Sequence, residues 1–128
     1  MDINKYIGLP FRHHGRDFDG VDCYGLVRLV LSEEFDVHLP DYWAYEDAND
    51  MNKIDSMFDE YLPIHTQRVE APEVGNIVLF KFRGYTSHIV IYDGDGKVLH
   101  VMRGMNSVCV PVQSGILRGR LEGYYAAG

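Results

Sequence analysis

The order of hydrophobic and polar residues changes once along the chain, near Ala71 and Pro72. Before this point apolar residues recur with the 3.6-residue period of a helix, and after it they fall in short blocks bounded by turn residues. Helices followed by strands favour an α+β fold, with N-terminal helices packed on a C-terminal antiparallel sheet of five to six strands that could curl into an open barrel. No repeat or linker-like tract divides the sequence, so we expect a single domain over residues 1–128.

Two segments of the first half predict helices. The stretch DCYGLVRLVLSEEF, residues 22–35, is apolar up to Leu31 and then polar, as in a mostly buried helix with an exposed end. Asp22 is its candidate N-cap, because a carboxylate can accept hydrogen bonds from the first free N–H groups. The stretch NDMNKIDSMFDEYL, residues 49–62, repeats apolar side chains at helical spacing. Between them, HLPDYWAYED predicts a loop over residues 38–47.

Five short strands are expected after Pro72. They are NIVLFKF (76–82), HIVIY (88–92), KVLHVM (97–102), SVCVPV (107–112) and EGYYAA (122–127). The sequences RG and DGDG mark turns between the first three, since glycine supplies the positive φ angles that tight hairpins need.

Two histidines, His88 and His100, lie on neighbouring expected strands on either side of DGDG. If the loop has three residues, 93–95, the two histidines pair and both rings project from one face, because side chains alternate along a strand. A two-residue loop would pair His88 with Val101 and send the rings to opposite faces. A shared face therefore requires an odd loop or a β-bulge.

Charge and composition narrow the function classes. The net charge is −7, and the sequence contains no cluster of Lys and Arg residues. Both observations argue against nucleic acid as a partner. No apolar stretch approaches the ~20 residues of a membrane span. The two cysteines, Cys23 and Cys109, form no CxxC pair, although one disulfide between them stays open. The opening MDINKYIGLPFRHHG lacks a secretory leader pattern, so we expect a protein made in the cytoplasm.

Cys23 begins the first expected helix and is a candidate nucleophile. The helix N-terminus and an imidazolium at His88 would both lower the thiol pKa from about 8.5, and His100 would fix the orientation and tautomer of the His88 ring. Asp22 would raise the thiol pKa, so we expect its carboxylate to face backbone N–H groups or a substrate amine. Alternatively, Cys23 is a buried core cysteine, or all three residues bind zinc, although no CxxC or HExxH pair supports a zinc site.

Four motifs, in order, resemble the NlpC family of cell-wall cysteine peptidases, papain-like enzymes that cut peptidoglycan stem peptides. YIGLPFRHHG resembles the family's Y-x-G-x-P-Y-x-x-G, DCYGLV its nucleophile motif DCSGLV, VGNIVLFKF its P-G-D-L-V-F-F, and SHIVIYDGDGKVLHV its x-H-V-G-I-Y-x-G-x-G-x-x-I-H-A. The resemblance implies a papain-like fold and a cysteine hydrolase, for which we expect neither cofactor nor metal. It implies Cys23 as nucleophile, His88 as general base and His100 as third member of the triad.

Two departures from the family pattern concern substrate binding. Phe11 stands where the family has a tyrosine that helps to bind the oxyanion or orient the thiol, and Tyr24 stands where its motif has serine. Together with Asp22, which would recognise a substrate amine, these are the expected substrate-binding residues. Tyr24, His13 and Arg12 are candidate oxyanion donors besides the backbone N–H of the nucleophile.

Tyr24, followed by GLVRLVL and LPDY, resembles the versions of the family found in phage tail proteins and prophages. We therefore expect a tail-associated enzyme that opens the cell wall locally, with peptidoglycan peptides as substrate and other tail proteins as partners. The missing leader fits delivery by a particle or by lysis. The alternative, motivated by Phe11 and Tyr24, is a structural tail component that keeps the fold with little or no activity.

Overall fold

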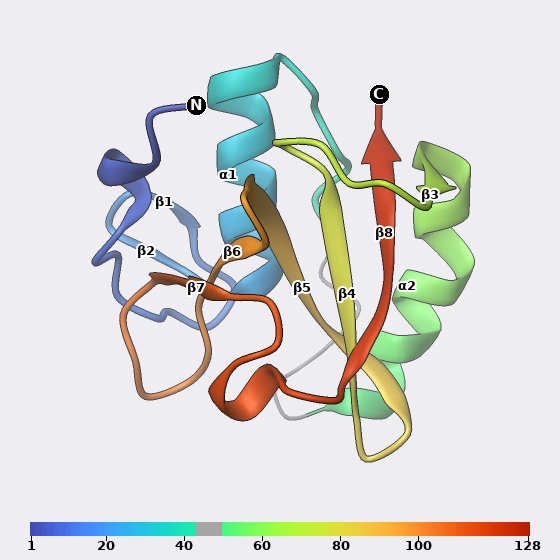
Figure 1. Ribbon diagram of the computed structural model, residues 1–128. Coiled ribbons are helices and arrows are strands. Elements are labelled where there is room, and N and C mark those ends of the chain that lie inside the picture. Colours follow the sequence, from blue (N-terminus) through green and yellow to red (C-terminus); the bar gives the residue numbers. More distant parts are fainter. Residues whose placement is uncertain (43–49) are drawn as a thin grey trace.

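In the computed structural model, which describes residues 1–42 and 50–128, two α-helices pack on one face of a six-stranded sheet (Figure 1). The helices are α1 (Cys23–Phe35) and α2 (Met51–His65). The sheet contains β3 (Thr66–Val69), β4 (Ile77–Phe82), β5 (Tyr85–Gly94), β6 (Lys97–His100), β7 (Val108–Pro111) and β8 (Leu121–Ala127). Its strands are antiparallel in the order β3-β8-β4-β5-β6-β7. The predicted α+β class is confirmed.

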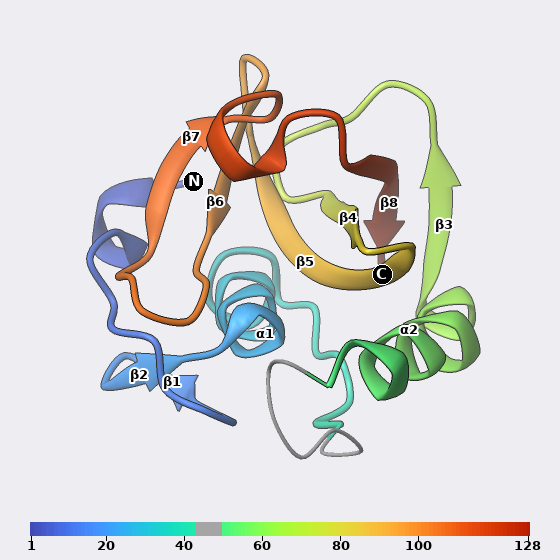
Figure 2. The ribbon, with the colours of Figure 1, turned by 90° about the horizontal axis from the view of Figure 1, so that it is seen from below.

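The sheet is curled, and its two faces bury separate apolar clusters (Figure 2). One face packs against α1 and α2 through Ile77, Leu79, Ile89, Ile91 and Leu99. The other face carries Val78, Phe80, Phe82, Val90 and Val98, which pack against Leu117 of the 3-10 helix η2 (Gly115–Leu117). Strands buried on both faces explain the nearly continuous apolar run of β4 and β5. The expected open, curled sheet is therefore present.

The N-terminal segment forms a small layer beside α1. It contains the 3-10 helix η1 (Ile3–Tyr6) and a two-stranded sheet of β1 (Arg16–Asp17) and β2 (Gly20–Val21). Gly25, in the first turn of α1, lies directly against the carbonyl of Gly15. Because a side chain there would overlap with backbone, the start of α1 is held close to β1 and β2.

The expected elements are found with shifted ends. The predicted second helix stops before Pro63, but α2 continues through it to His65. Proline removes only one backbone donor in this last turn, and the Thr66 hydroxyl donates to the Leu62 carbonyl. The pattern missed β3, an edge strand that pairs only with β8 in the described sheet and exposes Gln67 and Arg68. The predicted loop 38–47 is confirmed over its first part, and residues 43–47 lie outside the described residues.

β5 carries one extra residue relative to each neighbour. Ser87 is the additional residue opposite β4, and Asp93 is the additional residue opposite β6. The turn between β5 and β6 has two residues, Asp95 and Gly96, both with positive φ. Of the two arrangements that would give a shared face, the three-residue loop is not formed, and Ile91 pairs with Leu99. The predicted alternative, a β-bulge, is confirmed. Its extra residue shifts the pairing by one, so that His88 and His100 point to the same face of the sheet.

Within the described ranges, no helix has the length and apolar character that crossing a bilayer requires.

The contact at Gly25 gives a stability prediction. Alanine normally stabilises a helix interior over glycine by about 0.5–1 kcal/mol, but a Cβ at Gly25 would meet the Gly15 carbonyl. We expect Gly25→Ala to lower the free energy of unfolding by about 2 kcal/mol or more, measured by urea denaturation. The control is Gly104→Ala, which meets no atom within 4 Å but has a φ of +84°, and which should cost about 1 kcal/mol. A Gly25→Ala protein as stable as wild type would contradict the close packing.

Candidate active site

Cys23 is the first residue of α1, and its side chain is half-buried against β5. The backbone N–H groups of Ile89 and Tyr24 hydrogen-bond its sulfur. Since Ile89 directly follows His88, the thiol lies against the peptide next to the candidate base. The sequence prediction that Cys23 begins a helix is confirmed.

Asp22 is the N-cap of α1, and its carboxylate is nearly inaccessible, with 1% of the residue exposed. Oδ1 accepts a hydrogen bond from the Gly25 N–H at 2.8 Å and from Arg16 Nη1 at 2.7 Å. Arg16 also donates from Nε to Asp41 Oδ1 at 2.6 Å. The expectation that Asp22 faces backbone N–H groups is therefore confirmed. Both of these hydrogen bonds end on Oδ1 of this buried carboxylate, and the expected contact with a substrate amine stays a prediction.

His88 and His100 lie on one face of the sheet and hydrogen-bond each other, with His88 Nε2 3.0 Å from His100 Nδ1. Both residues are 4% exposed. The His88 ring also packs against Phe80 and meets Phe82 edge-on. This bond leaves Nδ1 of His88 as the ring nitrogen for a second partner. The structure thus brings together the two histidines that sequence register could place only conditionally.

Cys23 and His88 line the same cavity, which has a volume of about 310 Å³. Its lining consists of Phe11, Cys23, Met51, Phe82, Ser87, His88, Val101, Met102 and Arg103. Phe11 is therefore found where a substrate-contacting residue was expected. Ser87, the bulge residue before His88, and Arg103, three residues after His100, were missed by the sequence analysis, although their closeness in sequence to the two histidines was a usable signal.

Burial controls the protonation of the site. It raises the pKa of the Cys23 thiol to about 12, and the neighbouring Asp22 carboxylate contributes in the same direction. It lowers the pKa of His88 to about 3, with a further contribution from His100, and the pKa of His100 to about 4. Both shifts act against the expected imidazolium and thiolate, because removal from water disfavours both charged forms. Burial therefore favours the neutral thiol and the neutral form of both imidazoles.

Tyr24 packs against residues outside the cavity and does not line it. The residue is 1% exposed, and its hydroxyl donates to the Pro40 carbonyl at 2.5 Å. Its ring stacks on Tyr42, and Arg28 donates to the Leu39 carbonyl. The expected roles of Tyr24 in substrate binding and as an oxyanion donor are therefore wrong. The motifs DCYGLV and LPDY instead form one packed unit.

The remaining candidate donors lie outside the cavity. Arg12 and His13 are exposed in the segment before β1, and neither is among the residues that line the cavity. Phe11 has no hydroxyl. The backbone N–H of Cys23 is left as the expected oxyanion donor, since Asp22 occupies the N–H groups of Gly25 and Leu26.

The structure does not support the two alternative interpretations of the cysteines and histidines, a disulfide bond and a zinc site. Cys23 and Cys109 are both free thiols, so the disulfide left open by the sequence is not formed. Cys109 lies on β7, where its thiol donates to Asp93 Oδ2. Among the residues that the structure describes, no three His, Cys, Asp or Glu side chains come together as metal ligands would. The zinc interpretation therefore lacks a ligand set in this part of the chain.

Comparisons with known proteins agree with the sequence motifs. The sequence model of the NlpC/P60 family matches residues 8–123. The Escherichia coli (strain K12) protein named "Probable endopeptidase NlpC" is 27% identical over 125 residues, which is 96% of this chain and 66% of that protein. The chain thus spans slightly less than two thirds of the length of this curated relative.

Two solved structures show the same fold. The NlpC/p60 domain of peptidoglycan hydrolase SagA has a TM-score of 0.64 at 21% identity, over 98% of this chain and 92% of that one. An NlpC/P60 family protein from Bacillus cereus has a TM-score of 0.70 at 17% identity, over 93% of this chain and 35% of that one. Because the family match covers nearly the whole sequence, the chain belongs to the NlpC/P60 family.

Proposed function

We propose that this protein is a cysteine endopeptidase that hydrolyses an amide bond in peptidoglycan stem peptides. The observation that carries the proposal is the shared cavity of Cys23 and His88, with His100 bonded to the far nitrogen of the His88 ring. The family membership supports it. The printed names of an endopeptidase and a peptidoglycan hydrolase among similar proteins support the substrate class.

The reaction starts from neutral groups. The 3.0 Å contact between His88 Nε2 and His100 Nδ1 permits the tautomer in which His88 donates its Nε2–H. In this tautomer Nδ1 of His88 is unprotonated and accepts the thiol proton. As this proton moves, the sulfur of Cys23 bonds to the substrate carbonyl carbon. The oxygen becomes negative and accepts a hydrogen bond from the Cys23 backbone N–H at the helix N-terminus.

Collapse of this intermediate breaks the carbon–nitrogen bond. His88 gives the proton to the leaving amine, and a thioester with Cys23 remains. A water molecule then loses a proton to His88 while its oxygen attacks the thioester. The acid product departs, and the sulfur recovers its proton from His88. One base and one nucleophile therefore suffice for both half-reactions.

The first test is digestion of purified muropeptides. Cys23→Ala removes the nucleophile, and we expect product formation to fall by at least about 10³-fold, measured by mass spectrometry of the released peptides. The matched control is Cys109→Ala, on a strand outside the cavity, which should digest at the wild-type rate. Equal rates for wild type and Cys23→Ala would eliminate the hydrolase and favour the inactive structural component.

The second test concerns His100 as a positioning residue. Because the pKa of His88 lies near 3, the wild-type base stays unprotonated as the pH falls, and kcat/KM should persist to about pH 4. His100→Gln removes a charge that lowers the His88 pKa, so the acid limb of the kcat/KM profile should move to higher pH. At pH 7, kcat should fall by about 10²-fold because the ring loses its orientation.

The measurement is the pH profile of muropeptide digestion between pH 3 and 8, with circular dichroism at each pH to verify folding. A wild-type acid limb centred near 6.5, the ordinary histidine value, would show that His88 is not the buried neutral base described here. If the acid limb of the pH profile is unchanged in a folded His100→Gln protein, His100 does not position His88 and contributes packing alone.

We further propose that the protein works in a phage or prophage tail. The packed unit of Tyr24 and residues 39–42 supports this, since these residues carry the resemblance to tail-associated members. We expect mass spectrometry of purified tail particles from the source to detect the chain, with a cytoplasmic protein of equal abundance as the contamination control. Particles that digest the wall but lack the chain would contradict this location.

A further inference from the structure

The wall of the cavity that holds Cys23 and His88 is mostly apolar. Its apolar members are Phe11, Met51, Phe82, Val101 and Met102. Besides Cys23 and His88, the polar side chains of the described lining are Ser87 and Arg103. A peptide that enters such a cavity brings an N–H donor and a C=O acceptor for each residue, and both lose their hydrogen bonds to water. The few polar groups of the wall must therefore serve as their partners.

A β-bulge turns Ser87 toward this cavity. Ser87 is the extra residue of β5 opposite β4, so it has no pairing partner on that strand. Thr86 before it and Ile89 after it both face α2 and α1, the helix side of the sheet. Because side chains alternate along a strand, Ser87 after Thr86 and His88 before Ile89 project to the other side, where both line the cavity. The bulge thus places a hydroxyl beside the imidazole of the proposed base.

The hydroxyl of Ser87 has no hydrogen-bond partner within the described part of the chain, although the residue is 8% exposed. Every enclosed side-chain oxygen and nitrogen of the described residues has a partner, so the Ser87 oxygen must reach the cavity surface. The buried Ser107 shows the ordinary arrangement, since its hydroxyl accepts from the Leu9 N–H and donates to the Tyr6 carbonyl. A nearly buried hydroxyl without such partners indicates a site for a group from outside the chain.

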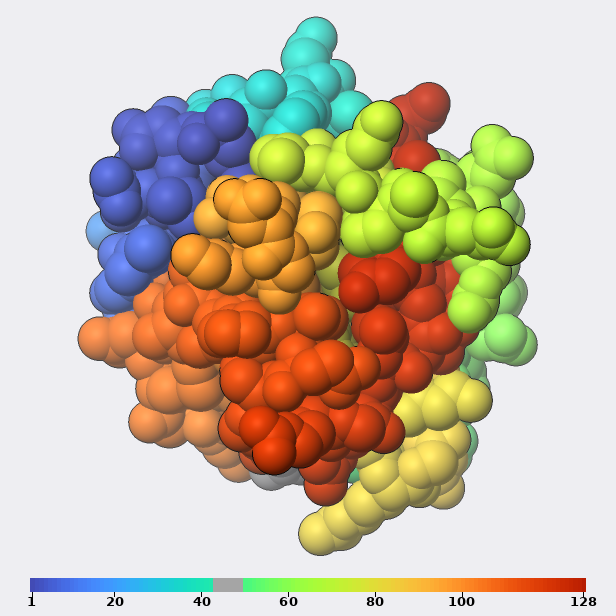
Figure 3. Space-filling view, in the orientation of Figure 1, coloured from blue at the N-terminus to red at the C-terminus, as the bar shows by residue number. Residues whose placement is uncertain are grey.

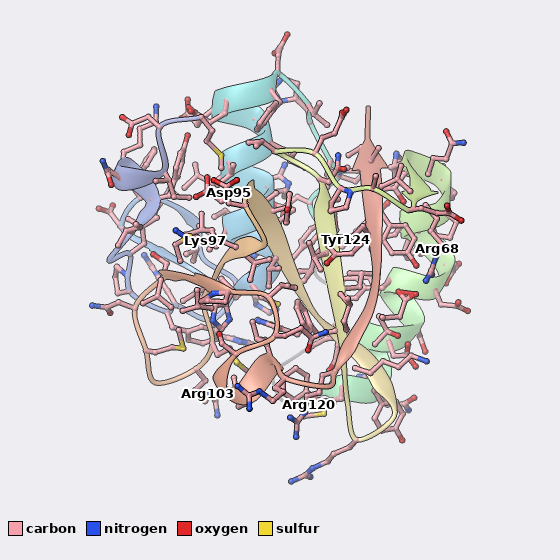
Figure 4. The ribbon with its side chains drawn as sticks, viewed as in Figure 1. Arg68, Asp95, Lys97, Arg103, Arg120 and Tyr124 are labelled. Carbon is pink, nitrogen blue, oxygen red and sulfur yellow. The ribbon has the colours of Figure 1, made fainter. Side chains whose placement is uncertain are left out.

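Ser87 lies at the end of the sheet where the β4–β5 hairpin leaves the body of the molecule. Figure 3 shows this hairpin, in yellow, projecting at the lower right. In Figure 4, Arg103 marks the loop after β6 at the same lower end, whereas Asp95 marks the turn at the opposite end of β5. The cavity lies between the hairpin and this loop, because both contribute to its lining.

The described side chains of the cavity offer many donors and few acceptors. Arg103 can only donate, and the backbone N–H of Cys23 is assigned to the substrate carbonyl oxygen in the proposed reaction. There, Nδ1 of His88 takes up the thiol proton. None of the described lining residues carries a carboxylate, and the thioether sulfurs of the two methionines are weak acceptors. The Ser87 oxygen is therefore the side-chain acceptor that this wall offers to a substrate N–H.

We propose that the Ser87 hydroxyl accepts a hydrogen bond from the substrate N–H nearest to the attacked carbonyl, on the side of the cleaved bond that becomes the thioester. This bond holds the carbonyl carbon over the Cys23 sulfur, because it fixes the substrate backbone beside the base. It also makes the site selective, since a substrate without this N–H leaves the hydroxyl without a partner. The identification of the bound group as part of a peptide rests on the proposed function.

The test compares two stem peptides that differ only at this N–H, which an ester oxygen replaces in the second peptide. The ester also changes the neighbouring carbonyl, so the measured quantity is the ratio of kcat/KM for the two peptides in each protein, from mass spectrometry of the released products. In wild type we expect this ratio to favour the N–H peptide by about fivefold to tenfold. In Ser87→Ala it should fall to within about twofold of unity, through slower cleavage of the N–H peptide.

The matched control is Thr86→Ala, which removes the neighbouring hydroxyl on the opposite side of β5, outside the cavity. Its ratio should equal that of wild type, and Ser87→Thr, which keeps the hydroxyl, should retain a preference for the N–H peptide. Labelling of Cys23 by methyl methanethiosulfonate, a small reagent without N–H groups, should proceed equally in wild type and Ser87→Ala. Circular dichroism verifies that each variant is folded.

Three results would overturn the role of Ser87 and leave the endopeptidase assignment standing. They are equal kcat/KM values for the two peptides in wild type, an undiminished ratio in folded Ser87→Ala, and a loss of the ratio in Thr86→Ala as well. Labelling of Cys23 that slows in Ser87→Ala as much as peptide cleavage does would also overturn it, because Ser87 would then act on the thiol. Failure of wild type to cleave either peptide would instead overturn the proposed function.

Discussion

The buried ion pair of Asp22 and Arg16 is the interaction on which the placement of the thiol depends. Asp22 caps α1 through the Gly25 N–H, and Arg16 balances its charge from β1 while also bonding to Asp41. Removing one partner of such a pair leaves an uncompensated buried charge, a loss of about 3–5 kcal/mol. The cap fixes where α1 begins, and therefore where Cys23 stands relative to β5. The carboxylate that would oppose thiolate formation is thus part of the device that positions the thiol.

The unit formed by Tyr24 and residues 39–42 extends this support away from the cavity. Tyr24 donates to the Pro40 carbonyl and stacks on Tyr42, whose hydroxyl lies 3.1 Å from His65 Nε2 at the end of α2. Arg16 also donates to the Tyr42 carbonyl. The same aromatic residue that departs from the family motif therefore connects α1, which begins at Cys23, to α2. Its substitution for serine is a packing feature, and the substrate side of the site is formed by other residues.

Desolvation decides the electrostatic character of the site. It disfavours the charged forms of the thiol and of both imidazoles, and in the proposed reaction this couples transfer of the thiol proton to attack on the substrate. Among the groups that the described chain places on the cavity wall, charge enters at Arg103, where the wall opens to solvent. The exposure of Arg103 agrees with the cost of burying a charge.

The sequence by itself determined the α+β class, both helices, the Asp22 cap and Cys23 at the start of α1, because these depend on local periodicity and capping. It could not determine that His88 and His100 share a face, because one bulge residue, Asp93, changes which residues of β5 and β6 point to the same side. Nor could it show that Arg16 pairs with Asp22, that Tyr24 packs on residues 40–42 or that Arg103 lines the cavity, because these contacts join residues distant in sequence. Burial and long-range contacts are properties of the folded chain, and for this reason only the tertiary structure decided the protonation of the site and the residues that line it.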